Sequence, residues 1–151
     1  MSRKPSLTSD AIPVATPPFE FHATLTRLED GLDTLHHSIE LLRERTGRAA
    51  DDRNLILFET ALAEIGSNVL IYTGKHGIGG TPVEYELRLV AGTATASFTD
   101  QGPPLHNQMP RAMPARTSEA GRGLAIARKV LDELGYKRDG EVNYWRLVKR
   151  L

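Results

Sequence analysis

The chain has 151 residues, and its 19 basic and 19 acidic side chains give a formal net charge of zero. This balance provides no basic surface for nucleic acid or an anionic membrane, and it does not oppose association into a homodimer. The absence of cysteine excludes disulfides, thiol catalysis and cysteine-ligated metals. No apolar run approaches the roughly 20 residues of a membrane-spanning helix, and no hydrophobic region follows Arg3 and Lys4. We therefore expect a cytoplasmic protein with neither nucleic acid nor membrane as a direct partner.

The N-terminal third of the chain contains a tail, a strand and a helix. Residues 1–18 are rich in proline, serine, threonine and alanine and lack periodicity, so we interpret them as a flexible tail ahead of a single domain over residues 19–151. In residues 19–25 (FEFHATL) every second residue is apolar, which predicts a half-buried strand. Residues 28–46 carry leucine and isoleucine at helical spacing and precede Gly47, which predicts an amphipathic helix.

The most regular pattern lies in residues 52–73, DRNLILFETALAEIGSNVLIYT, where apolar residues recur at alternating steps of three and four. This spacing predicts a helix with one continuous apolar stripe, and Asp51 or Asp52 suits its N-cap. Glu64 and Asn68 lie four residues apart on the shoulder of the stripe, so they are neighbours on the helix surface. Such an acid and amide either form a solvated pair at the helix edge or reach into a shared cavity.

A glycine-rich connection and a hairpin follow this helix. Residues 74–80 (GKHGIGG) are predicted to end the helix and to form a plain connection, because they lack the ending of a phosphate-binding P-loop. Residues 82–90 and 94–99 each alternate as strands do and are separated by a glycine turn, which predicts a β-hairpin. The second strand runs directly into Asp100 and Gly102.

Residues 103–120 contain four prolines and no periodicity, as long functional loops often do. Because Gly102 and Gly121 flank this segment, we predict that it is a lid that is mobile in the free protein and orders when a ligand binds. A helix is then predicted over residues 124–134, with a closing hairpin over residues 136–148.

The predicted order is strand, two helices, two strands, lid, helix and two strands. Because the helices and strands are segregated rather than alternating, we predict an α+β fold. Its architecture is a two-layer sandwich of a mainly antiparallel mixed sheet with helices on one face. A parallel, doubly wound sheet would need more crossover connections than this order provides.

Three short motifs carry the chemistry of the chain: an acid and an amide on a helix, an Asp-x-Gly at a strand end, and a Gly-x-Gly at a helix start. Each motif alone is common. Their order and spacing resemble the N, G1 and G2 boxes of the GHKL (Bergerat) ATP-binding fold, and in particular the small anti-sigma-factor serine/threonine kinases of bacteria. The resemblance covers residues 19–151 and rests on EIGSN at 64–68, TDQGPPL at 99–105 and the segment from Ala120 to Leu151.

This resemblance implies a binding site for ATP and Mg²⁺. In the family pattern, Asp100 accepts a hydrogen bond from the adenine amine, and Gly102 lets the backbone pass close to the base. Asn68 ligates Mg²⁺, while Glu64 acts as general base toward a serine hydroxyl. The resemblance further implies that the phosphates bind at a helix start on Gly121, Arg122, Gly123 and Leu124.

The resemblance also implies an ATP-dependent serine/threonine kinase that phosphorylates an anti-anti-sigma (STAS) protein and sequesters a sigma factor. Pro104 replaces a glycine that the family often carries, and Tyr72 stands where relatives often have histidine, so ATP binding is better supported than turnover. The alternative is a non-catalytic ATP- or ADP-binding module that sequesters a protein partner. The catalytic module of a sensor histidine kinase is disfavoured, because no helix pair with a phosphoacceptor histidine precedes the domain. A structural protein without a ligand would require all three motifs to be coincidental.

Overall fold

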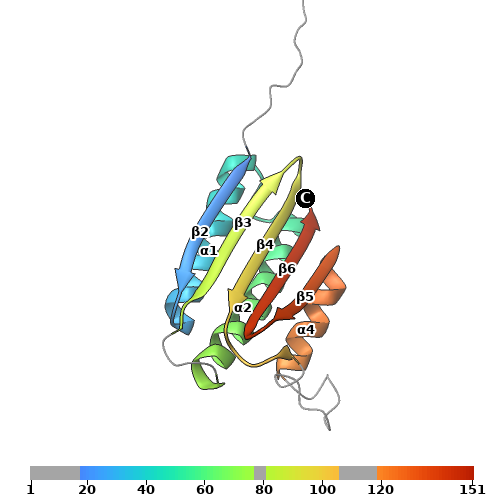
Figure 1. Ribbon diagram of the computed structural model, residues 1–151. Helices are drawn as coiled ribbons and strands as arrows, with labels where there is room; N and C mark the ends of the chain where they lie inside the picture. Colours follow the sequence, from blue (N-terminus) through green and yellow to red (C-terminus); the bar gives the residue numbers. More distant parts are fainter. Residues whose placement is uncertain (1–17, 77–80, 106–118) are drawn as a thin grey trace, which may run out of the picture.

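The computed structural model describes residues 18–76, 81–105 and 119–151 (Figure 1). The predicted tail up to residue 17 and the lid residues 106–118 lie outside this part. The described elements follow the predicted order, and they are β2 (Phe19–Leu25), α1 (Leu28–Thr46), α2 (Arg53–His76), β3 (Val83–Val90), β4 (Thr93–Asp100), α4 (Glu119–Val130), β5 (Glu133–Asp139) and β6 (Val142–Arg150).

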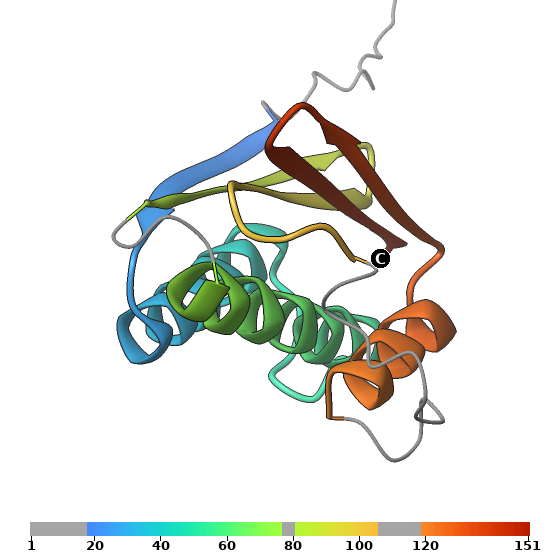
Figure 2. The same ribbon diagram turned by 60° about the horizontal axis from the view of Figure 1, so that its bottom comes forward.

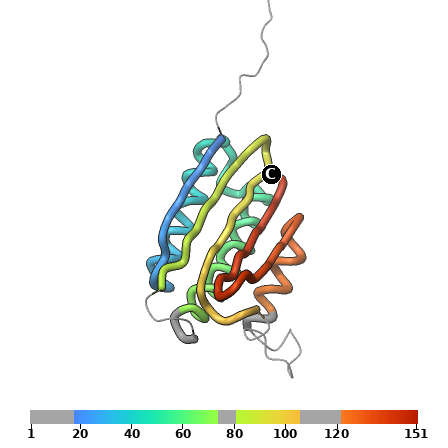
Figure 3. Tube along the Cα trace, viewed as in Figure 1, coloured from blue at the N-terminus to red at the C-terminus, as the bar shows by residue number. Residues whose placement is uncertain are grey.

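The strands form one five-stranded sheet in the order β2-β3-β4-β6-β5. The predicted α+β two-layer architecture is confirmed, and every pairing between described strands is antiparallel rather than mixed. Figure 1 shows β2 and β5 at the two edges, and Figure 2 shows that the described helices cover only one face of the sheet. The traced chain in Figure 3 ends beside the β3–β4 turn, where Leu151 N donates to Gly92 O at 2.8 Å.

Helix α2 is the centre of the helical layer, since it contacts α1 on one side and α4 on the other as well as the sheet. The predicted N-cap is confirmed, because Leu55 N donates to Asp52 Oδ1 at 3.0 Å. Gly74 does not end the helix, which continues to His76. By length and composition alone, Arg53–Thr73 is apolar enough to cross a membrane, contrary to the sequence analysis. Its apolar stripe instead faces the sheet and supplies the core residues Leu55, Phe58, Ala61, Leu62, Ile65 and Val69.

Helix α4 differs most from the prediction. It runs over Glu119–Val130 instead of residues 124–134, so it begins before the Gly-x-Gly motif and ends one turn earlier. After Leu131, Asp132 N donates to Val148 O at 2.9 Å, and Leu134 pairs with Leu147 in the sheet. Leu131 N still donates to Ala127 O as in a helix, and strand pairing with β6 begins at Glu133. Glu133 and Leu134 therefore join the sheet instead of extending the helix, because β6 satisfies backbone groups on one side of the edge strand β5.

An aromatic row crosses the inner face of the sheet and supports the site from beneath. Tyr85, Phe98, Trp145 and Tyr136 are successive cross-strand partners on β3, β4, β6 and β5. The ring centroids of Tyr85 and Phe98 lie 5.3 Å apart, and those of Tyr136 and Trp145 lie 4.7 Å apart. Cross-strand aromatic pairs of this kind stabilise a sheet and fix its register.

Candidate functional site

A cavity of about 360 Å³ opens between α2 and α4. Four residues singled out in the sequence line it together, namely Glu64 and Asn68 from α2 with Arg122 and Gly123 from α4. The structure therefore brings two motifs that are more than fifty residues apart to one place. Of the two sequence alternatives for the acid and the amide, this arrangement matches the shared cavity.

Gly123 allows the close approach of α4 to α2 at this cavity. A Cβ atom added at Gly123 would lie 2.6 Å from Glu64 Oε1, which is closer than non-bonded atoms approach. Any larger residue would thus displace the Glu64 carboxylate. The glycine is required here for space, since Gly123 lies inside a helix and needs no unusual backbone angle.

The Gly121–Leu124 segment lies within the first two turns of α4 instead of preceding it. The N–H groups of a helix's first turn have no acceptor within the helix, and in α4 that turn begins at Glu119. Leu124 is buried in the hydrophobic core, and its side chain does not line the cavity.

Asp100 lies at the end of β4, and only 2 % of its surface is exposed. Its Oδ1 accepts two hydrogen bonds, from Gly102 N at 2.8 Å and from Asn143 Nδ2 at 2.9 Å. Its Oδ2 is buried and has no hydrogen-bond partner. Burial raises the pKa of Asp100, and the bonds from Asn143 and Gly102 and the nearby indole of Trp145 oppose that rise.

Like Asp100, Thr73 lies beside Gly102. A Cβ atom at Gly102 would lie 3.0 Å from Thr73 Oγ1 and 3.1 Å from Asp100 Oδ1, so a larger residue at this position would press against both side chains. The buried Thr73 hydroxyl has no partner. In other helical Ser and Thr residues of the chain, such as Ser67 and Thr60, the hydroxyl donates to the carbonyl four residues earlier. Thr73 Oγ1 and Asp100 Oδ2 are thus a donor and an acceptor that are both buried without a partner, as expected where a ligand supplies the missing bonds.

Sequence reasoning gave no role to four residues of this polar centre, Thr73, Tyr136, Arg138 and Asn143, although Asn143 is one of the positions that carry the resemblance. Asn143 is fully buried, and its side chain connects Asp100 with Tyr136 and Arg138. The sequence contained a signal for two of them, because the alternation along their strands places the polar residues Asn143 and Arg138 on the inner, apolar side of the sheet. Tyr72 and Pro104, the two departures from the family pattern, are half-buried and do not line the cavity.

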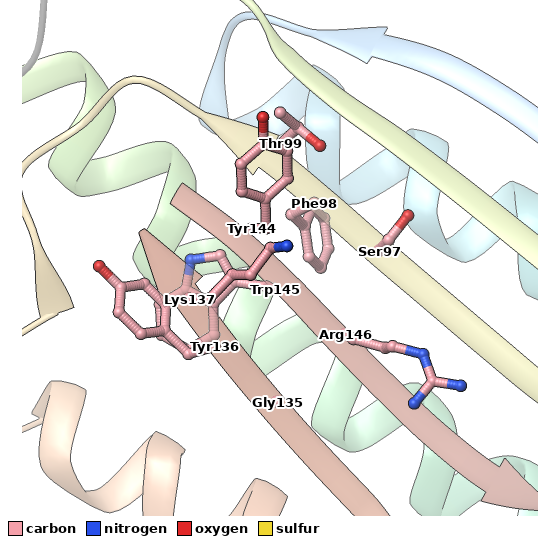
Figure 4. Close-up of a pocket in the computed structure, with 9 residues that line it drawn as sticks. All are labelled: Ser97, Phe98, Thr99, Gly135, Tyr136, Lys137, Tyr144, Trp145 and Arg146. Carbon is pink, nitrogen blue, oxygen red and sulfur yellow. The ribbon is translucent and has the colours of Figure 1, made fainter. Parts of the chain in front are cut away.

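Two other surface features contain none of the predicted site residues. A hollow of about 500 Å³ lies on the uncovered face of the sheet beside Gly135, where Lys137, Tyr144 and Arg146 extend from β5 and β6 (Figure 4). The second feature is a metal-ligand-like cluster on β2 and β3, formed by Glu20, His22 and Glu86. Arg88 pairs with both glutamates, so this cluster already contains its own cation.

Comparison with known proteins agrees with this geometry. The sequence profile of the family described as Histidine kinase-like ATPase domain matches residues 26–149. Among solved structures, the chain is similar to the crystal structure of the RsbU and RsbW domains of Rv1364c from Mycobacterium tuberculosis, with a TM-score of 0.58 and 20% sequence identity. The match covers 90% of this chain and 33% of that chain, and at this identity it shows a shared fold. No curated protein matches the chain.

Proposed function

Because this chain belongs to the histidine kinase-like ATPase domain family, we propose that it is an ATP-dependent anti-sigma factor. In this proposal it has serine/threonine protein kinase activity toward a STAS-type anti-anti-sigma protein. Membership of the family implies ATP binding. One observation carries the assignment of the base site: Asp100 is held through Oδ1, while its Oδ2 and the hydroxyl of Thr73, which lies beside Gly102, are buried without partners.

The chemistry of this pair selects adenine. Adenine presents an exocyclic amine that donates to a carboxylate oxygen, whereas guanine presents a carbonyl oxygen at the same position and would face Asp100 Oδ2 with a second acceptor. The Thr73 hydroxyl is a donor that suits a ring nitrogen of the base. The bond to adenine would satisfy a buried carboxylate oxygen that otherwise costs desolvation energy.

Helix α2 carries both ends of the proposed nucleotide site. Thr73 lies beyond Asn68 and Glu64 on the same helix, and a rise of about 1.5 Å per residue places it about 7 and 14 Å from them along the axis. The base therefore lies toward the C-terminal end of α2. The phosphates lie in the cavity beside Arg122, near the start of α4.

The amide oxygen of Asn68 is of the kind that Mg²⁺ prefers, and it shares one cavity with Glu64 and Arg122. The chemistry that a bound Mg²⁺ supplies is neutralisation of the phosphate charges. Glu64 is positioned as the general base: it takes the proton of the serine hydroxyl while the serine oxygen bonds to the γ-phosphorus. The bond from that phosphorus to the bridging oxygen breaks, and ADP leaves.

The rim of the cavity suits a protein substrate. Leu28 and Ile126 line the cavity with 38% and 39% of their surfaces exposed, and the half-buried Ile71 lines it as well. Exposed aliphatic side chains around a polar cavity are typical of surfaces that dock another protein. We assign this rim to the segment of the STAS partner that presents its serine, and we propose a sigma factor as the second, sequestered partner.

Phosphate transfer to candidate STAS proteins tests the proposal. The protein is incubated with Mg²⁺ and ATP labelled at the γ-phosphate, with each STAS protein and with its acceptor Ser→Ala variant. Label is expected only on the serine-containing form. Glu64→Gln is the matched variant, because it keeps the shape and one acceptor oxygen but cannot take the proton; it should bind ATP and transfer no phosphate. Tight ATP binding without transfer to any STAS protein would favour the non-catalytic module, and unchanged transfer by Glu64→Gln would refute the general-base role.

A further inference from the structure

Asn143 occupies the middle of a polar row on the inner face of the sheet. In the strand register, Asp100 of β4 is its partner on one side and Arg138 of β5 is its partner on the other. Asn143 is completely buried, so its amide depends on protein groups for all of its hydrogen bonds. The row places a carboxylate, an amide and a guanidinium side by side.

The orientation of the Asn143 amide follows from its neighbours. Arg138 Nη1 approaches Asn143 Oδ1 at 2.9 Å, and because a guanidinium only donates, this atom of Asn143 must be the oxygen. Nδ2 consequently faces Asp100 Oδ1 at 2.9 Å, together with the carbonyl oxygens of Gly102 at 3.1 Å and Pro103 at 3.0 Å. Two N–H groups thus serve three acceptors at the end of β4.

The oxygen side of the same amide reaches the segment that follows β4. The Tyr136 hydroxyl donates to Asn143 Oδ1 at 2.6 Å and accepts from Leu105 N at 2.9 Å. Arg138 also donates to Gly102 O at 3.0 Å. The ring of Tyr136 lies against that of Trp145, which holds the hydroxyl in place (Figure 4). One side chain therefore connects the Asp100 carboxylate to the backbone at Gly102 and, through Tyr136, to Leu105.

We propose that Asn143 is a positioning residue of the nucleotide site: it fixes Asp100 through Oδ1, so that only Oδ2 is presented to the base, and it couples that carboxylate to the Gly102–Leu105 backbone. This inference rests on the proposed nucleotide site. In this arrangement Asn143 sets the preference for adenine over guanine, because a carboxylate held in one orientation presents a single acceptor. A carboxylate without this bond is free to rotate and to take up a proton, and a protonated carboxyl group donates to guanine as readily as it accepts from adenine.

The electrostatics of Asp100 support this role. Burial raises the pKa of Asp100, and the bond from Asn143 is the strongest of the interactions that lower it. Removal of that bond raises the pKa further, so the acceptor form is lost at a higher pH. The groups that face Asp100 are Asn143 and Trp145 of β6, Arg138 of β5 and the Gly102 N–H.

Two β-branched variants of nearly equal shape, Asn143→Thr and Asn143→Val, test the proposal. The threonine keeps one hydroxyl donor beside Asp100, whereas the valine keeps none. For Asn143→Val we expect ATP affinity, measured by calorimetry, to fall about 10- to 100-fold and the ATP-over-GTP preference to fall with it. Asn143→Thr should retain part of both. The pH below which ATP affinity declines should move upward for Asn143→Val, a change that a purely structural role would not produce.

Tyr136→Phe is the control for the other arm of the network. It removes the acceptor of Leu105 N but leaves Asn143 Nδ2 against Asp100. We expect it to change the ATP-over-GTP preference and the pH profile less than Asn143→Val does, while the Leu105 amide exchanges hydrogen faster. Circular dichroism of each variant establishes that the fold is kept.

A titration of Asp100 in the nucleotide-free protein separates this inference from the proposed function. Followed by carbon NMR, the Asp100 carboxyl should titrate at higher pH in Asn143→Val than in the wild type and Tyr136→Phe. If the wild type bound no nucleotide, the proposed function would fail and the role of Asn143 in nucleotide binding would fail with it, even with this shift present. If the wild type bound ATP, and Asn143→Val bound it with the same affinity, preference and pH profile, Asn143 would not be a positioning residue, and the proposed function would stand.

Discussion

Replacement of Asp100 by asparagine changes one atom of the proposed base site. In the wild-type protein Oδ1 accepts from Gly102 N and Asn143 Nδ2, while Oδ2 has no partner. The carbonyl oxygen of asparagine can replace Oδ1 and keep both bonds, which places its NH₂ group where Oδ2 was. The base then meets a neutral donor in place of a charged acceptor.

The expected loss follows from that exchange. Hydrogen bonds to charged groups contribute about 1.5–3 kcal/mol, so ATP affinity should fall about 10- to 150-fold. GTP affinity should not fall in parallel, because the new NH₂ group donates to the guanine carbonyl oxygen. The ratio of the two affinities should therefore drop further than either value alone. The free energy of unfolding at pH 7 should stay equal or rise, because burial disfavours the charged form of Asp100.

Calorimetric titration with ATP and GTP measures both affinities, and chemical denaturation measures the stability. Asp139→Asn makes the same chemical change at an exposed position at the end of β5 and should leave both affinities unchanged. Wild-type affinity for ATP together with a wild-type ATP-to-GTP ratio in Asp100→Asn would show that Oδ2 does not read the base.

Three further predictions concern other parts of the molecule. Gly123→Ala should move the Glu64 carboxylate by about 1 Å, since the new Cβ would lie 2.6 Å from Oε1. A displacement of about 1 Å lowers phosphate transfer by up to about 100-fold, while ATP affinity and thermal stability should be kept. Unchanged phosphate transfer would contradict the role of Glu64. The Glu59 carboxylate, 2.6 Å from His36 Nδ1, raises the pKa of His36 above its ordinary value of 6.5. The stabilisation from this pair is fully present below pH 6.5 and is lost as the pH rises through the raised pKa of His36. The melting temperature of the wild type should therefore decline slightly as the pH rises from 6.5 through this pKa. In His36→Gln this decline should be absent. Lys149→Met should lower the free energy of unfolding by about 1–3 kcal/mol, because Nζ of the buried Lys149 donates to the last carbonyl of α4, Val130 O, at 2.9 Å. Chemical denaturation measures this difference. If the variant were as stable as the wild type, this contact would not hold the end of α4.

The sequence by itself determined the elements whose pattern is local. The three- and four-residue spacing of the α2 stripe, the Asp52 cap and the alternation in β2, β3, β4 and β6 are properties of contiguous residues, and the structure reproduces them. The segregated order of the elements also determined the α+β sandwich. The motif containing Glu64 and Asn68 was visible because helical spacing alone places these two residues together.

Only the tertiary structure decided where α4 ends and how the polar centre is built. Residues 131–134 suit a helix by their spacing, but Glu133 and Leu134 pair with β6, which decided the competition there in favour of a strand. The Asp100–Asn143–Arg138 row exists because the register of β4, β6 and β5 aligns residues that lie far apart in the chain. Thr73 is equally invisible in the sequence, since its unpaired hydroxyl is defined by what β4 and Gly102 place opposite it. Periodicity along the chain records which side of an element faces the core, whereas register between strands and contact across layers depend on the energy of the whole packed fold.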